Sequence, residues 1–153
     1  MNKLLRIQST LLKLPFGKYL FSKTAARMAP YFTTIDPRID HLEHNLIKVS
    51  MRKRPSVHNH IKTVHAIACC NLCEFAAGIS MEASSPAHRR WIPTGMEVAY
   101  VAKADNHLTA SCDLSGTDWE HCTEVPCKVS VKTIDGKEVV TATIYMKVSD
   151  RKR

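Results

Sequence analysis

Glu74 lies near the middle of the least polar stretch of the chain, residues 64–79. A charged side chain in such a stretch needs water, a partner or a function, because burying it without compensation is costly. Asn59 and His65 precede it by fifteen and nine residues, where the apolar run begins. A partly desolvated carboxylate is suited to act as a general base near neutral pH, or as a nucleophile. The spacing therefore indicates a charged site near the start of a helix.

The apolar run predicts a long helix from about residue 64 to residue 81, with Thr63 as its N-cap. Because the run is apolar almost all round, we expect the helix to be buried on most faces. Its first turn, residues 63–66, has N–H groups without helical acceptors and the positive end of the helix dipole. Such a turn can bind an oxyanion or polarise a carbonyl, so an acyl group is the expected ligand.

Strands are predicted on both sides of this helix. Residues 45–52 alternate apolar and polar side chains, and Pro55 closes the pattern. Beyond a connection bracketed by Pro86 and Pro93, similar alternation predicts strands at 96–102, 108–114, 125–134 and 139–148. Asp135-Gly136 suits a two-residue type I′ turn between the last two strands. Together these elements predict an α+β domain in which a curved antiparallel sheet wraps around a long central helix.

The first 35 residues carry six basic side chains and no acidic one, with apolar residues at helical spacing. Such a composition is compatible with a mitochondrial presequence, which would place the protein in the matrix. The apolar material continues through Tyr31 and Phe32, however, so we favour a helical extension over residues 1–40 that packs on a domain of residues 41–153. We expect no transmembrane helix and a reducing, cytoplasmic location.

Composition limits the classes of function. A chain of 153 residues with 44% hydrophobic content supports one globular core rather than two domains. The net charge of +8 favours an anionic partner: a nucleic acid, an acidic membrane surface or a phosphorylated small molecule. Nucleic acid is the least favoured, because no motif of stacking aromatic residues accompanies the basic residues.

Four possible metal ligands occur near the helix start. His65, Cys69 and Cys73 fall on one helical stripe, and Cys70 adds another thiol. A structural zinc site normally draws its ligands from two separate elements, so we expect neither a metal nor a cofactor here. Buried thiols that fill small gaps in the core explain these cysteines better.

The pattern around the helix start resembles that of the hotdog-fold thioesterases, most closely the PaaI-type branch and its relatives of unassigned function. The family signature is an Asn, then Gly-x-Val-His-Gly-Gly leading into the central helix, then Leu-Ala-Asp or Leu-Ala-Glu. Here the corresponding stretch runs from Asn59 to Ile67, and Leu72-Cys73-Glu74 follows at the family's spacing. The resemblance spans about residues 45–148, and segments 29–32 and 87–93 extend it over nearly the whole chain.

The resemblance implies a thioesterase for acyl-CoA or an acyl carrier, active as a dimer or tetramer with each site shared between two subunits. Asn59 would orient the thioester or water, His65 would have a structural or orienting role, and Glu74 from the other subunit would activate water. The oxyanion hole would be formed by backbone at Val64 and Ala66. Phosphates of coenzyme A would be bound by Arg52, Arg54, Arg89 and Arg90. An apolar tunnel for the acyl chain would be lined by Tyr31, Phe32, Phe75 and Trp91.

Three positions depart from the signature. Lys62 replaces the first glycine, Ala66-Ile67 replaces the glycine pair, and Gly78 stands where some relatives carry a Ser or Thr. A non-catalytic hotdog protein that binds acyl-CoA or another lipid-like ligand is therefore the alternative function. Asn59 could equally be a turn residue that caps local amides, and Glu74 could be a structural or interface carboxylate.

Overall fold

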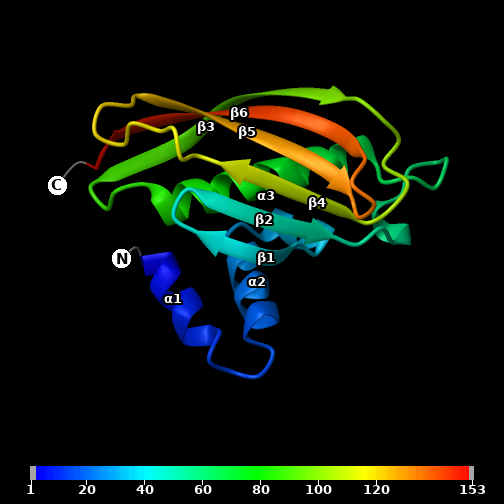
Figure 1. The fold of residues 1–153 in the computed structure, drawn as a ribbon, viewed down its shortest axis with the longest axis horizontal. Coiled ribbons are helices and arrows are strands. Elements are labelled where there is room, and N and C mark those ends of the chain that lie inside the picture. Colours follow the sequence, from blue (N-terminus) through cyan, green and yellow to red (C-terminus); the bar gives the residue numbers. More distant parts are fainter. Residues whose placement is uncertain (1–2, 152–153) are drawn as a thin grey trace.

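Six antiparallel strands form one curved sheet in the order β1-β2-β4-β5-β6-β3, and a long helix, α3, lies against one of its faces (Figure 1). The structure is a computed structural model that describes residues 3–151. The strands are β1 (Arg38–Glu43), β2 (Leu46–Met51), β3 (Arg89–Tyr100), β4 (Leu108–Asp113), β5 (Glu124–Thr133) and β6 (Glu138–Asp150). β1 and β3 form the two edges of the sheet. This is the α+β architecture that the sequence predicts.

Helix α3 (Ala66–Ser84) contacts β2, β4, β5 and β6, and its side chains Leu72, Phe75 and Met81 are fully buried. By length and composition α3 would suffice to cross a membrane, although we expect no transmembrane helix from the sequence. Most of α3 is buried inside the fold, however, and the core helix of a globular domain has the same composition. Its position against the sheet therefore accounts for its apolar character.

The predicted N-cap of α3 is wrong. Instead of Thr63, the N-cap is His65, whose Nδ1 accepts a hydrogen bond of 3.0 Å from the N–H of Ile67. An isolated antiparallel bridge between His58 and Val64 keeps the chain extended up to the helix. The helix consequently begins two residues later than predicted.

Most predicted strands agree with the structure within two residues at each end, but two features at the sheet edges do not. β1 is not predicted from the sequence, because its side chains do not alternate, and a register shift interrupts its pairing with β2. β3 begins at Arg89 rather than at residue 96, so the expected connection before Pro93 is a strand. Pro93 is tolerated because β3 is an edge strand, where a missing backbone N–H need not break a ladder. The pairing of β3 with β6 shifts register between Pro93 and Gly95.

The turn between β5 and β6 is not the predicted type I′ turn. That type requires positive φ at both central residues. Among the residues of this turn only Gly136 has positive φ (90°), and its N–H donates a hydrogen bond of 2.9 Å to the carbonyl of Thr133. Thr133 in turn pairs with Lys137, which leaves a three-residue loop with glycine in the left-handed position.

Three helical segments precede β1: α1 (Lys3–Leu11), α2 (Gly17–Met28) and the 3₁₀ helix η1 (Pro30–Ile35). α2 packs on β1 and buries Phe21, Ala25 and Ala26. α1 in turn packs on α2 and α3. The chain from Gly17 onward therefore contributes directly to the core.

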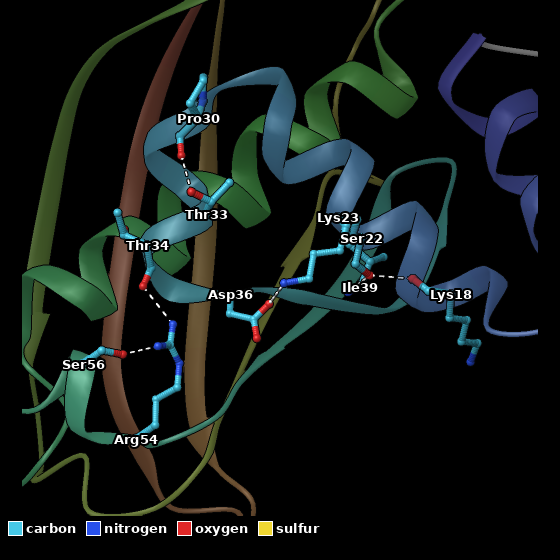
Figure 2. Close-up of polar contacts among 10 residues, drawn as sticks. All are labelled: Lys18, Ser22, Lys23, Pro30, Thr33, Thr34, Asp36, Ile39, Arg54 and Ser56. Atoms are coloured by element: carbon cyan, nitrogen blue, oxygen red, sulfur yellow. Dashed lines mark hydrogen bonds and ion pairs between the residues drawn. The ribbon is translucent and has the colours of Figure 1, made fainter.

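Polar contacts hold α2 and η1 in place (Figure 2). Ser22 Oγ on α2 accepts a hydrogen bond of 2.9 Å from the N–H of Ile39 in β1. Lys23 Nζ lies 2.6 Å from Asp36 Oδ1, at the end of η1. Arg54, just before the 3₁₀ helix η2 (Pro55–Val57), donates a hydrogen bond of 2.9 Å to the carbonyl of Thr34. These contacts position η1, which forms one wall of the site described next.

Candidate active site

A cavity of about 330 Å³ lies between α2, η1, α3 and the strands β3 and β6. Its lining is mostly apolar and includes Phe32, Phe75 and Trp91, three of the four residues predicted to form an acyl tunnel. Tyr31, the fourth, does not line this cavity and is largely exposed. Pockets of this size and polarity are typical of small-ligand sites.

Aromatic packing shapes the cavity walls. Phe32 from η1 meets Phe75 from α3 edge-on, with ring centroids 5.1 Å apart. Gly78, one turn after Glu74, brings the backbone of α3 close to Trp91: a Cβ at this position would lie 3.4 Å from the Trp91 ring. The departure from the family signature at Gly78 therefore makes space next to Trp91.

Glu74 is half-buried on the wall of this cavity. No hydrogen bond or ion pair to its carboxylate is present within residues 3–151. A charged side chain in this helix needs water, a partner or a function, and the described part of the chain provides no partner for Glu74. Glu74 remains available to water or to a ligand.

A second carboxylate, not predicted from the sequence, lies on the same wall. Glu82 also lines the cavity, together with Met28, Pro93 and Met146. Glu74, Gly78 and Glu82 are spaced by four residues, so they lie on one face of α3. That spacing is a signal in the sequence, whereas the contributions of α2 and β3 depend on tertiary packing.

The start of α3 borders a second, smaller cavity of about 230 Å³, lined by Tyr31, His58, His65 and Asn71 among others. The backbone amides at the start of α3 are only partly available to a ligand. The N–H of Val64 donates to the carbonyl of Ala104 (2.8 Å), so the predicted oxyanion role of Val64 is contradicted by its hydrogen bond. The N–H of Ala66 opens the helix and has no acceptor within it, so this amide can stabilise an oxyanion.

The side chain of Asn59 forms its hydrogen bonds within the loop before the helix. Its Oδ1 accepts hydrogen bonds from the N–H groups of Ile61 and Thr63 (both 3.1 Å), and its Nδ2 donates to Thr63 Oγ1 (2.8 Å). Lys62 within this loop has a positive φ of 62°, which explains why the family signature has glycine there. The side chain of Asn59 thus caps local amides, the second of the two roles considered from the sequence.

Glu74 and Ala66 do not meet within one chain. They are eight residues apart on the same helix, which corresponds to about 12 Å along its axis. Two groups that act on one carbonyl must both lie about 3 Å from the reacting atoms. One copy of the chain therefore holds the two halves of the predicted site apart.

Two of the four predicted phosphate-binding arginines have partners inside the fold. Arg54 bonds to Thr34 and Ser56, and Arg89 bonds to the carbonyls of Glu120 and Cys122. Arg52 and Arg90 are exposed, although Arg90 Nε also donates to Ser149 Oγ (3.0 Å). Arg52 and Arg90 are therefore freer than the other two to meet an anionic ligand, but the strand register places them at opposite ends of the sheet.

Two of the three cysteines of α3, Cys69 and Cys73, lie in the core, whereas Cys70 is half-buried and its Sγ lies 3.1 Å from Tyr100 Oη. Burial raises the pKa of the Cys69 thiol to about 12 and raises that of Cys73 as well. Both thiols are therefore protonated at neutral pH and are poor nucleophiles and metal ligands. Within residues 3–151 no three His, Cys, Asp or Glu side chains come together in a group that could hold a metal ion.

Comparison with known proteins identifies the family of this chain. The sequence profile of a family described as a domain of unknown function, DUF4442, matches residues 17–148. The chain belongs to the DUF4442 family. No curated protein matches it.

Solved structures resemble this DUF4442 protein over most of its length. A structural-genomics protein, APC5556, is 38% identical, with a TM-score of 0.85 over 97% of this chain and 99% of that one. A Pseudomonas aeruginosa protein of unknown function, PA5026, described as a probable thioesterase, is 16% identical, with a TM-score of 0.76 over 90% and 97%. A thioesterase family protein from Silicibacter pomeroyi is 13% identical, with a TM-score of 0.73 over 90% and 100%. The DUF4442 chain has the hotdog fold of these neighbours, which confirms the predicted fold class.

Proposed function

We propose that this protein hydrolyses acyl thioesters, with acyl-CoA as the substrate class. The observation that carries the proposal is the carboxylate of Glu74, which has no partner among the described residues and lies on the wall of an apolar cavity of about 330 Å³. Solved neighbours described as thioesterases support it through their shared fold. The signature from Asn59 to Glu74 further suggests the PaaI-type branch.

In the proposed reaction Glu74 acts as a general base. It takes a proton from water as the water oxygen bonds to the thioester carbon, and the N–H of Ala66 stabilises the resulting oxyanion. The carbon–sulfur bond then breaks, and the leaving thiolate takes up the proton that Glu74 holds. The products are a carboxylic acid and the free thiol, so the reaction needs no redox partner.

A second copy of the chain would complete the site. The axial separation of about 12 Å between Glu74 and Ala66 supports a site in which the two groups acting on one thioester come from different subunits. β3 pairs with β6 on one side, and its outer edge has no partner strand among the described residues. It exposes Ile92 (61%) and Tyr100 (54%), and such an edge is suited to pair with its own copy. A two-fold axis near the middle of β3 would bring each helix start toward the centre of the other helix.

The acyl chain and the coenzyme A part of the substrate would bind at different places on the protein. The acyl chain would lie in the cavity between Phe32, Phe75 and Trp91. The phosphates of coenzyme A would meet the exposed guanidinium group of either Arg52 or Arg90, because these two residues lie at opposite ends of the sheet.

A non-catalytic acyl-CoA binder is the second candidate. The hydrogen bonds of Asn59 and Val64 favour it, because they remove one orienting side chain and one amide from the proposed machinery. Such a protein would bind acyl-CoA in the cavity without hydrolysing it.

Hydrolysis of acyl-CoA across chain lengths, measured by release of free thiol, tests the proposal. Glu74→Gln should lower kcat by about 10²–10⁴. Glu82→Gln, on the same wall, and Glu97→Gln, on β3, should each change it less than about 10-fold. Equal rates for Glu74→Gln and wild type would refute the catalytic role. Tight binding of a non-hydrolysable thioether analogue without turnover of the thioester would establish the second candidate instead.

A further inference from the structure

The turn that joins α1 to α2 presents apolar side chains to solvent. Phe16 is 85% exposed, and Leu12 and Leu14 are 45% and 51% exposed. Tyr19 and Leu20, in the first turn of α2, are also exposed. Five large apolar side chains within nine residues form a patch, which we call the α1–α2 tip. A patch of this kind marks a contact with another molecule or with a membrane.

The backbone makes the tip protrude. The α1–α2 turn lies at the end of the helix pair farthest from the sheet (Figure 1). Gly17 allows the tight reversal, since a Cβ there would lie 1.9 Å from the carbonyl oxygen of Leu11. Phe16 has a left-handed conformation (φ 59°), which the N–H of Gly17 supports by bonding to the carbonyl of Leu14 (3.0 Å). The fold thus holds Phe16 toward solvent, where it is 85% exposed.

Basic residues accompany these apolar side chains. Residues 1–35 contain six basic and no acidic residues, whereas the net charge of the whole chain is +8. Lys13 lies within the tip and is exposed. Lys18, at the start of α2, donates from Nζ to the carbonyl of Asp40 in β1, and Arg6 lies farther back on α1; both are exposed. Exposed apolar groups framed by cations are complementary to a bilayer surface with anionic headgroups.

We propose that the α1–α2 tip docks the protein on anionic lipid bilayers. Leu12, Leu14 and Phe16 enter the boundary between headgroups and acyl chains, while Lys13 meets the lipid phosphates. The aliphatic side chains in the tip favour hydrocarbon over stacked nucleic-acid bases. α2 packs on β1, at the edge of the sheet opposite β3, so pairing through β3 would leave the tip accessible. A dimer would carry two tips, and avidity would strengthen binding.

Sedimentation of the full chain with phospholipid vesicles tests this docking. We expect wild type to bind phosphatidylcholine vesicles that contain about one third phosphatidylserine, and to bind pure phosphatidylcholine about 10-fold or more weakly. Phe16→Asn should weaken binding to the anionic vesicles about 10-fold or more, because it removes the most exposed apolar group. Asparagine tolerates the left-handed conformation and caps helices, so the fold of the variant should be retained. Its thermal midpoint checks this.

Lys13→Glu and matched controls separate charge from apolar contact. Lys13→Glu should weaken binding to anionic vesicles about 10-fold at low salt, with little effect on neutral vesicles. Ile134→Ser removes another largely exposed apolar residue, at the β5–β6 turn (71% exposed), and Lys103→Glu reverses an exposed charge outside the tip. Both controls should bind as wild type does.

Three results would overturn the proposal: no binding to anionic vesicles, equal losses in tip and control variants, or a change of oligomeric state in Phe16→Asn with unchanged vesicle binding. The last result would assign the tip to contact between copies. None of these measurements depends on thioester hydrolysis, so the membrane docking and the proposed enzyme activity are tested independently.

Discussion

Phe32 in η1 packs edge-on against Phe75 in α3, with ring centroids 5.1 Å apart and ring planes at 70°. This contact joins the N-terminal helical segment to the core helix at the residue next to Glu74. The wall of the cavity is thereby part of the hydrophobic core, so ligand binding and stability depend on some of the same side chains.

Phe32→Ala should destabilise the protein by about 2–3 kcal/mol, below the usual range for a fully buried Phe because Phe32 is only half-buried. Urea denaturation measures this change. Tyr31→Ala, at the neighbouring exposed residue, should cost less than about 1 kcal/mol. Similar losses in the two variants would show that the aromatic contact does not hold η1 in place.

Ala66→Pro should abolish hydrolysis while preserving α3. Proline lacks the N–H that would bind the oxyanion, and it is favoured at the first position of a helix. The preceding residue, His65, already has the extended conformation (φ −63°, ψ 138°) that a following proline requires. Circular dichroism checks the helix, and the assay with acyl-CoA checks the activity.

A mixture of Ala66→Pro and Glu74→Gln chains then tests whether the site is shared. Each mixed dimer would contain one intact site, so random reassortment of equal amounts should restore about a quarter of the wild-type activity. A mixture that reassorts and stays inactive would mean that Ala66 and Glu74 do not act across a subunit interface.

Gly78→Leu should shorten the acyl chain that the protein accepts. The added side chain would project toward Trp91 and fill part of the cavity, because even a Cβ here lies 3.4 Å from the Trp91 ring. We expect KM for long-chain substrates to rise about 10-fold or more, with a smaller change for short-chain ones. Gly78→Ala is the control: it makes an ordinary contact and should stabilise α3 by about 0.5–1 kcal/mol. Parallel changes for all chain lengths would place the acyl chain elsewhere.

Asp36→Asn should remove a pH-dependent part of the stability. The hydrogen bond from Lys23 keeps the pKa of Asp36 below its ordinary value of 3.8. A carboxylate with a lowered pKa in the folded state stabilises the fold above its unfolded pKa, and this stability is lost as pH falls through the folded value. Because the pair is about one-third exposed, wild type should exceed Asp36→Asn by no more than about 1 kcal/mol at pH 7.

Urea denaturation at pH 7 and at pH 3 measures this difference, which should shrink at the lower pH. Asparagine suits the left-handed conformation of residue 36 (φ 48°), so the backbone is preserved. Asp40→Asn, which removes a nearby carboxylate that has no ion pair among the described residues, is the control for the loss of one negative charge. A difference that grows toward pH 3 would contradict the assigned direction of the shift.

The sequence alone determined the elements whose signal is local. Alternation of apolar and polar residues predicted β2, β4, β5 and β6, and the unbroken apolar run predicted α3. The same run marked Glu74 as a carboxylate that needs an explanation, because the cost of burying charge follows from residue type and surroundings in the sequence.

Only the tertiary structure decided the features that depend on distant partners. β1 became a strand through pairing with β2, and β3 begins before Pro93 because β6 supplies its hydrogen bonds. The amide of Val64 is occupied by the carbonyl of Ala104, forty residues away. The cavity beside Glu74 likewise needs walls from α2, η1, β3 and β6. Periodicity in one segment carries no information about such contacts, because they are formed by folding the whole chain.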